Sequence, residues 1–304
     1  MAKKKNKSKI ADIAKFETDG LIYNGSRPFS LSSIGTRTDS VYTSKKDYRS
    51  KLASMVKRID ELQATMNADN RHGILLVFQA MDAAGKDGTI RRVLTGVNPA
   101  GVQVYSFKKP SAEELDHGYL WRVIQRMPER GRIGVFNRSY YEEVLVVRVH
   151  PEILTEYQQI PQELTLDTDA VFESRFEQIR NFEEYAVSNG IKVIKFFLNV
   201  SKEEQRKRLL ARLDEPQKHW KFSFSDVDER EHWDSYMQAF TDCINKTATA
   251  TAPWAVIPAD DKLNMRLLVT RIVLQEMEKM NLQWPPANPR LSAEIDEVRA
   301  RLND

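Results

Sequence analysis

The sequence predicts an α/β protein with a parallel sheet that is covered by helices on both faces. Short apolar segments alternate along the chain with segments of helical period, as in proteins with a parallel sheet. The strand segments are apolar along their whole length, which is typical of strands without a solvent-facing side. One of these strands ends in the small-residue sequence AMDAAGKDG, and a helical segment follows it directly.

The strands and helices are expected in a regular order. A first helix begins near Lys46, because apolar residues recur at helical spacing from there. Buried strands are expected at Ile74–Gln79, Val102–Phe107, Ile133–Asn137, Ile191–Val200 and Trp254–Ile257. Further helices are expected at Lys86–Leu94, Ala112–Arg126, Ala170–Ser188, Lys202–Leu213, Arg230–Thr247 and Asp260–Met280.

This order divides the chain into three parts. Residues 1–45 are polar and lack a sustained period, so we expect an N-terminal extension that is partly ordered at best. Residues 46–283 form the α/β domain, and a basic helical segment at about 202–236 departs from the alternation. Residues 284–304 are Pro-rich and then highly charged, and we expect them to form a C-terminal tail.

Composition excludes several classes of protein. The chain has 304 residues, of which 41% are hydrophobic and 29% charged, as in a soluble globular protein. Its net charge of +3 does not indicate a protein that coats nucleic acid. No apolar run approaches the roughly 20 residues of a membrane span, and no apolar segment follows the basic start MAKKKNKSK. With Cys243 as its one cysteine, the chain is expected to be cytoplasmic and without a disulfide.

The sequence AMDAAGKDG has the features of a phosphate-binding loop. Small residues at Ala83, Ala84 and Gly85 let backbone N–H groups converge on an anion, and the following helix adds the positive end of its dipole. Lys86 supplies a positive charge. The usual pattern G-x-x-x-x-G-K-[ST] is altered, because Ala80 replaces the first glycine and Asp87 replaces Ser or Thr. The alternative is an ordinary strand-to-helix turn.

Asp82 is the unusual member of this loop. A phosphate would repel its carboxylate unless a cation or a proton lay between them, so Asp82 is expected to bind Mg²⁺ or to orient a phosphate. Asp87 either assists the metal or caps the helix, and we expect capping. Gly88 completes the segment expected to surround the phosphate.

A second group of polar residues follows the strand Ile133–Asn137, which we expect to lie beside the first strand. Asn137 occupies the position that usually supplies an acid for magnesium in nucleotide-binding sites. The acid is then expected from Glu142 or Glu143. Arg138 is placed for bidentate contact with phosphate, although a simple strand-end turn is an equal alternative.

Two basic segments complete the candidate site. Arg208 and Arg212 share one helix face and suggest a lid that closes over a polyanion, although a solvated charged helix explains them as well. Lys108, Lys109, Arg122 and Arg126 form a second basic region, with the two arginines four residues apart on a helix. His117 lacks a His or Cys partner at metal-ligand spacing, so we expect a structural hydrogen bond.

Taken together, these segments resemble the polyphosphate kinase type 2 family, and most closely its class III. The resemblance spans about residues 47–283. It rests on the segments QAMDAAGKDGTI, GVNPAGVQVYSFKKPSAEELDHGYLWR, GRIGVFNRSYYEEVLVVRVHPEIL, LDEPQKHWKFSFSDVDEREHWDSY and TATAPWAVIPADDK, which occur in the order typical of the family. It implies a P-loop kinase fold like that of thymidylate kinases, with a helical lid.

The resemblance also implies an activity and its participants. The expected reaction is reversible, Mg²⁺-dependent phosphoryl transfer from inorganic polyphosphate to AMP and ADP, with Mn²⁺ as a possible substitute metal and a homo-oligomer (dimer or tetramer) as the assembly. By motif position, Asp82, Lys86 and Arg138 are the functional residues of the loop and the strand end, while Arg208 and Arg212 belong to the lid. Asn137 and Glu143 match class III, whose members accept both mono- and diphosphates.

These expectations combine into one hypothesis. The loop holds the phosphate of the acceptor, and polyphosphate approaches along the surface formed by Lys108, Arg122 and Arg126. Asp82 and Glu143 are the expected metal ligands, and Glu143 recruits a second Mg²⁺ that stands in for the missing phosphate of a monophosphate. The rival functions are an ATP-dependent nucleotide kinase, which the missing loop Ser/Thr argues against, and a non-catalytic polyphosphate-binding regulator.

Overall fold

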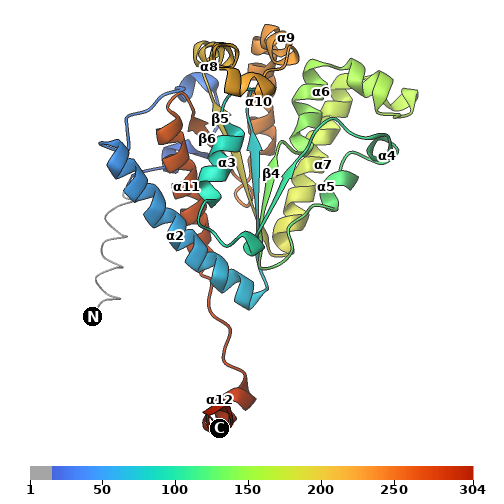
Figure 1. Cartoon of the computed structure of the whole chain (residues 1–304). Coiled ribbons are helices and arrows are strands. Elements are labelled where there is room, and N and C mark those ends of the chain that lie inside the picture. Colours follow the sequence, from blue (N-terminus) through green and yellow to red (C-terminus); the bar gives the residue numbers. More distant parts are fainter. Residues whose placement is uncertain (1–15, 304) are drawn as a thin grey trace.

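A six-stranded sheet forms the centre of the molecule. The computed structural model describes residues 16–303, and within them the strand order is β1-β6-β5-β2-β4-β3 (Figure 1). The strands are β1 (Ile22–Tyr23), β2 (Gly73–Gln79), β3 (Val102–Ser106), β4 (Ile133–Asn137), β5 (Ile191–Asn199) and β6 (Trp254–Pro258). All neighbouring pairs are parallel except β1 with β6. The predicted parallel sheet is confirmed.

Helices cover both faces of this sheet. One layer consists of α2 (Lys45–Asp69), α3 (Lys86–Leu94) and α11 (Lys262–Lys279), which pack against one another. The other consists of α6 (Val146–Val149), α7 (Thr168–Ser188) and α10 (Trp233–Thr247). Figure 1 shows these two layers on opposite sides of the strands. Because both sides are covered, all seven residues of β2 are buried, as expected for a central parallel strand.

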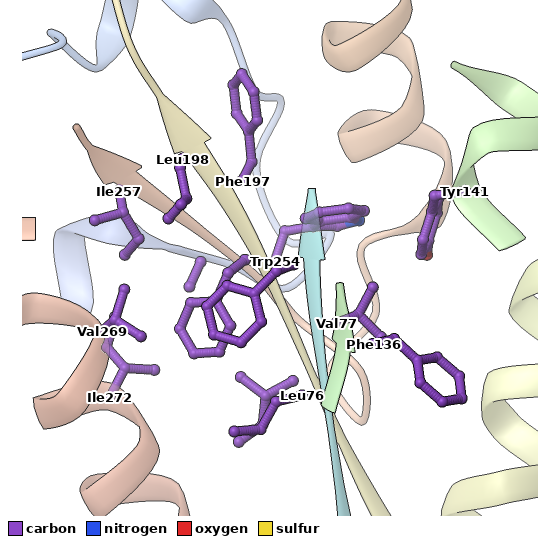
Figure 2. Close-up of a cluster of buried hydrophobic side chains, with 14 of the residues drawn as sticks. Leu76, Val77, Phe136, Tyr141, Phe197, Leu198, Trp254, Ile257, Val269 and Ile272 are labelled. Carbon is purple, nitrogen blue, oxygen red and sulfur yellow. The ribbon is translucent and has the colours of Figure 1, made fainter. Parts of the chain in front are cut away.

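The hydrophobic core extends through the sheet into both layers. Successive residues of a strand point to opposite faces, so Leu76 and Val77 contribute to different sides. Figure 2 shows Leu76 on the side of the strands that faces Val269 and Ile272 of α11, whereas Val77 lies beside Phe136, its partner in β4. All five side chains are at most 1% exposed. The core therefore holds the strand ends of β2 and β4 in a fixed register beneath the loops that follow them.

Residues 16–44 differ from the predicted extension, because they pack against the domain. They contain β1, which lengthens the sheet beside β6, and Tyr23 and Phe29 are buried. Asn245 in α10 accepts a hydrogen bond from the Phe29 N–H and donates one to the Phe29 carbonyl. The apolar residues of this segment follow no regular period, so sequence patterning gave no signal. The expectation for residues 1–15 lies outside the described residues.

The predicted helix Ala112–Arg126 is two short helices, α4 (Ala112–Leu115) and α5 (Trp121–Ile124). Ser111 and Glu114 form a capping box that starts α4, and the His117 Nδ1–H donates to the Glu113 carbonyl at 2.8 Å just after it ends. Arg126 follows α5, so it does not share a continuous helix with Arg122 as expected. His117 has the structural role that was predicted.

The remaining helices lie at opposite ends of the molecule. The segment formed by α8 (Lys202–Asp214), a 3₁₀ helix (Pro216–Lys221) and α9 (Ser225–Glu231) lies above the carboxyl ends of the strands (Figure 1), and we name it the lid. The C-terminal tail contains α12 (Pro289–Asn303), a helix that the sequence reading did not predict. None of the helices within residues 16–303 has the length and apolar character needed to cross a membrane.

Candidate active site

The site lies where β2 and β4 end side by side. Phe78 pairs with Asn137 in the parallel register, and the Arg138 N–H donates to the Phe78 carbonyl at 3.1 Å. The carboxyl ends of parallel strands meet at one edge, which is where α/β proteins bind ligands. The loops after the two strands therefore bring Asp82 and Arg138 together.

The loop after β2 has the backbone of an anion-binding turn. Gly85 precedes the first helical residue of α3 with a φ of 110°, and Ala83 has a φ of 59°, which is unusual for a residue with a side chain. The Lys86 ammonium folds back to the Ala80 carbonyl at 2.7 Å. Burial lowers the pKa of Lys86, and the carboxylate of Asp82 opposes that shift. The loop thus presents backbone N–H groups and a lysine held at its base.

Arg138 links two carboxylates at the centre of the site. Its guanidinium lies 2.8 Å from Asp82 Oδ1 and 3.7 Å from Glu142 Oε2. Burial disfavours the charged form, but Glu142 and Asp82 outweigh it, so the pKa of Arg138 is raised. Burial also raises the pKa of Glu142, against the opposing charges of Arg138 and Lys86. Like Ala83, Arg138 has a positive φ, 64°, so the backbone is strained where the site residues meet.

A buried ion pair holds the segment that carries Arg138 and Glu142. Tyr140 and Tyr141 both donate to Glu183 Oε1, at 2.8 and 2.7 Å, and Lys195 Nζ lies 2.6 Å from Glu183 Oε2. Lys195 also donates to the Thr247 carbonyl at 2.8 Å. This pair was not predicted from the sequence, although Lys195, in the middle of the strand IKVIKFFLN and between apolar neighbours, was an available signal.

A pocket of about 420 Å³ opens beside this cluster and shares Arg138 and Glu142 with it. Its walls are largely aromatic and aliphatic, and they include Phe107, Tyr119, Tyr157, Val146 and Ile153. Of the four residues expected to form a polyphosphate surface, Lys108, Lys109 and Arg122 line this pocket. Arg126 is not among its lining residues and lies over the Tyr105 ring. Three of the four basic residues therefore line a pocket whose other walls are largely apolar.

Glu143, which was expected to bind metal together with Asp82, is engaged by two other side chains. Its Oε2 accepts hydrogen bonds from Gln158 at 2.7 Å and from Arg175 at 2.8 Å. Arg175 is buried and lies 5.3 Å from the centre of the Tyr119 ring, so Glu143 supports the pocket wall. The acid beside Asp82 is Glu142. Within residues 16–303, no three His, Cys, Asp or Glu side chains are grouped to bind a metal by themselves.

The two lid arginines have structural partners. Arg208 is 7% exposed and donates to the carbonyls of Ala84 and Ala259 at 2.6 and 2.7 Å. It fastens the phosphate loop to the residue after β6, so backbone carbonyls hold the guanidinium that was expected to bind phosphate. Arg212 pairs with Asp226 of α9 and therefore ties α8 to the rest of the lid.

The side chains of Asn137 and Asp87 form a hydrogen bond with each other. The Asn137 amide donates to Asp87 Oδ1 at 2.6 Å, and Gly85, not Asp87, occupies the N-cap position of α3. The expected capping role of Asp87 is wrong, although its charge still lies in the first turn of α3, where the helix dipole favours it. A side chain at Gly88 would meet Arg266 Nη2 at 3.2 Å, so glycine allows this approach.

Three lid and helix residues join the site without any sequence signal. The Gln205 side chain in α8 donates to the Asp82 carbonyl at 3.1 Å. Glu229 of α9 and Tyr236 of α10 line the small hollow above Asp82, and the Tyr236 hydroxyl donates to Glu229 at 2.6 Å. Their contacts depend on how the lid packs, which local patterning does not encode.

Comparison with known proteins identifies similar chains over most of this length. A family model described as polyphosphate kinase 2 (PPK2) matches residues 42–285. An ADP-polyphosphate phosphotransferase of Rhodopseudomonas palustris is 50% identical over 88% of this chain and 92% of the relative. An AMP/ADP-polyphosphate phosphotransferase of Meiothermus ruber is 44% identical over 77% of this chain and 82% of the relative.

A solved structure agrees with the fold. The crystal structure of polyphosphate kinase 2 from Arthrobacter aurescens TC1 matches with a TM-score of 0.83 and 38% sequence identity. The match covers 94% of this chain and 98% of that chain. The expected P-loop kinase fold is therefore confirmed over nearly the whole described structure.

Proposed function

This chain belongs to the polyphosphate kinase 2 family, and from that premise we propose that it transfers phosphoryl groups from inorganic polyphosphate to AMP and ADP. The observation that carries the proposal is the cluster of Asp82, Lys86 and Arg138 at the edge of a largely apolar pocket. The charged cluster suits a phosphate chain, and the apolar pocket suits a nucleoside.

We assign the nucleotide acceptor to the 420 Å³ pocket. Phe107, Tyr119 and Tyr157 offer aromatic surface to a nucleobase, and pockets of about 300–1,000 Å³ with apolar walls are typical of small-molecule sites. Lys108, Lys109 and Arg122 give the same pocket positive charge for the nucleotide phosphates. This assignment replaces the sequence-based hypothesis, in which the loop held the acceptor and these residues held polyphosphate.

Polyphosphate, the donor, then binds at the loop after β2, next to the N-terminus of α3. Backbone N–H groups around Gly85 and the ammonium of Lys86 bind the transferred phosphate. Arg138 stands between the loop and the pocket and stabilises charge on the group in transit. The lid excludes water, which protects the phosphoryl group from hydrolysis. No protein nucleophile is required, because positioning and charge neutralisation suffice for an in-line transfer.

The carboxylates fit a divalent metal of the Mg²⁺ type. Mg²⁺ is commonly held by one or two carboxylates together with substrate phosphates and water. Asp82 and Glu142 flank Arg138 and supply such a pair, with Mn²⁺ as a substitute. When bound, Mg²⁺ neutralises phosphate charge, while Arg138 keeps the two carboxylates oriented toward the loop.

The test is a reaction without any nucleoside triphosphate. The protein is incubated with AMP, Mg²⁺ and long-chain polyphosphate, and nucleotides are separated by chromatography. We expect ADP first and ATP afterwards. Lys86→Met should abolish both, whereas Lys207→Met, which removes the same charge from an exposed lid position, should leave both unchanged. ADP formation that requires ATP instead of polyphosphate would establish the rival nucleotide kinase.

A further inference from the structure

A second basic pocket lies outside the candidate active site, among α2, α3 and α11. Its volume is about 470 Å³. Four cationic side chains line it: Lys45 and Arg49 from the first turns of α2, Arg92 from the end of α3, and Arg266 from α11. Figure 1 shows these three helices side by side on one face of the sheet. No carboxylate is among the residues that line the pocket.

Several polar groups of this pocket lack partners among residues 16–303. None of the four cations forms an ion pair with any residue between positions 16 and 303. Tyr48 is 7% exposed, and its hydroxyl, like Arg266 Nε, is buried without a hydrogen-bond partner among the residues described. Buried polar atoms are normally satisfied, so these atoms indicate a ligand that accepts hydrogen bonds and carries negative charge.

Positive charge continues from the active site to this pocket. Arg266 Nη2 passes within 3.2 Å of the position that a Cβ at Gly88 would take, two residues after Lys86. Along α3, Arg92 follows Lys86 by six residues, or about 9 Å of helix axis. The pKa of Lys262 is lowered, first by burial and then by the positive charge of Arg208. Arg266 and Lys218 lower it further, while the carboxylate of Glu204 opposes the shift. These cations therefore lie close enough to act on one another between the lid and the pocket.

We propose that this second pocket binds a distal part of the polyphosphate chain whose reacting end occupies the phosphate loop. A long linear polyanion must place many phosphates beyond the reacting one, and a row of unpaired cations favours it over water. The walls supply donors and apolar atoms but no carboxylate or carboxamide for a nucleobase. The inference rests on the proposed function, since it names a second contact for the same donor.

The test compares two double variants that remove the same charge from the same helices. In Lys45→Gln/Arg92→Gln both side chains come from the pocket, whereas in Lys46→Gln/Arg91→Gln neither lines it. All four residues are exposed, so we expect both proteins to fold normally. The first variant should raise the KM for long-chain polyphosphate about fivefold and leave that for tripolyphosphate within about twofold, since exposed ion pairs are individually weak. The kcat and the KM for ADP should not change.

The salt dependence of the KM for long-chain polyphosphate distinguishes lost binding from a structural defect, because a structural defect would not change it. Binding of a linear polyanion releases counterions, so the logarithm of KM for long chains rises with the logarithm of salt concentration. This slope should be shallower in Lys45→Gln/Arg92→Gln than in the unmodified protein and in the matched control.

Three results would overturn the inference: an unchanged long-chain KM, an equal rise in both double variants, or an equal rise for long chains and tripolyphosphate. Each would be observed in an enzyme that still forms ATP from ADP and polyphosphate. Failure of the proposed function itself would instead appear as no product with the unmodified protein.

Discussion

Two ion pairs in this molecule have similar chemistry and opposite surroundings. Lys195 and Glu183 lie 2.6 Å apart with side chains 0% and 1% exposed. Arg138 and Asp82 lie 2.8 Å apart with side chains 42% and 27% exposed. In the closed pair, both oxygens of Glu183 are occupied by Lys195 and two tyrosines. The open pair borders a pocket and has room to exchange partners.

The difference assigns separate tasks to the two pairs. A buried charge that lost its partner would be costly, so the closed pair stays formed and fixes Tyr140 and Tyr141. These tyrosines follow Arg138 within three residues, and the closed pair therefore positions the open one. A half-exposed arginine beside a carboxylate can instead turn to a phosphate when one arrives.

The largest effect is expected from Asp82→Asn in the open pair. The change keeps the shape of the side chain but removes the charge that faces metal and phosphate. We expect kcat/KM for polyphosphate and ADP to fall about 1,000-fold, or about 4 kcal/mol of transition-state stabilisation. Urea unfolding should change by less than about 1 kcal/mol, because the pair is partly exposed. Retention of most activity would remove Asp82 from the proposed mechanism.

Breaking the closed pair should act mainly on stability. Lys195→Met leaves Glu183 charged and buried, which is expected to lower the free energy of unfolding by about 3–5 kcal/mol. Urea denaturation measures this loss. Lys195→Met/Glu183→Gln removes both charges and should be more stable than the single variant. If the double variant were less stable than Lys195→Met, the cost would come from packing and not from an uncompensated charge.

A third pair, Glu143 with Arg175, lies at the pocket wall and should affect acceptor choice. Glu143→Gln removes the charge that pairs with Arg175 near Tyr119. We expect a nucleotide with one phosphate to depend more on this wall than one with two, because it has fewer phosphate contacts elsewhere. We expect the KM for AMP to rise about tenfold, equivalent to about 1.4 kcal/mol, and that for ADP about twofold. Steady-state kinetics with each acceptor measures the two changes. Equal changes for AMP and ADP would refute a role in discrimination.

The hydrogen bonds that connect the closed and open pairs should each have a modest effect. Tyr140→Phe removes one donor to Glu183 and leaves Tyr141 in place. We expect a loss of about 1 kcal/mol in unfolding free energy and less than a threefold change in kcat. Tyr141→Phe is the matched comparison. A large fall in kcat for one variant alone would show that this hydroxyl acts on the reaction directly.

The smallest effect concerns pH. Burial raises the pKa of Glu142, so the folded protein binds this proton more tightly than the unfolded chain does. Ionisation of Glu142 therefore costs stability, and that cost grows as pH rises from the ordinary value of 4.5 toward the raised pKa. Glu142→Gln should gain stability relative to the unmodified protein over this interval. A constant difference between the two proteins would argue against the raised pKa.

The central part of the fold was predictable because local patterns determine it. The helix Lys86–Leu94 and the strand Ile133–Asn137 were predicted with the bounds that the structure has. Each is a short apolar or amphipathic segment with a clear turn beside it, and the parallel order follows from the alternation. The short strand β1 and helix α12 were missed, since two residues carry no period and α12 follows a Pro-rich segment that suggested an irregular tail.

The sequence predicted where the residues of the candidate site lie in the fold, but not which side chains they contact. The proximity of Lys86, Asp82 and Arg138 could be predicted because strand ends in a parallel sheet converge. The partner of Glu143 could not be predicted, because Arg175 lies 32 residues away and contacts it only when α7 packs beside the loop. The contacts of Arg208 were not predictable for the same reason: a helix face with two arginines does not reveal that one of them binds the carbonyls of the loop.

Transfer of radiolabelled phosphate from polyphosphate to AMP, with Mg²⁺ present and nucleoside triphosphates absent, tests the proposed function most directly. We expect label in ADP and then in ATP for the unmodified protein, normal transfer in Lys207→Met, transfer slower by about 1,000-fold in Asp82→Asn, and none in Lys86→Met. Transfer of label to AMP from ATP, with none from polyphosphate, would contradict the central claim that the open pair and its loop receive a phosphate chain.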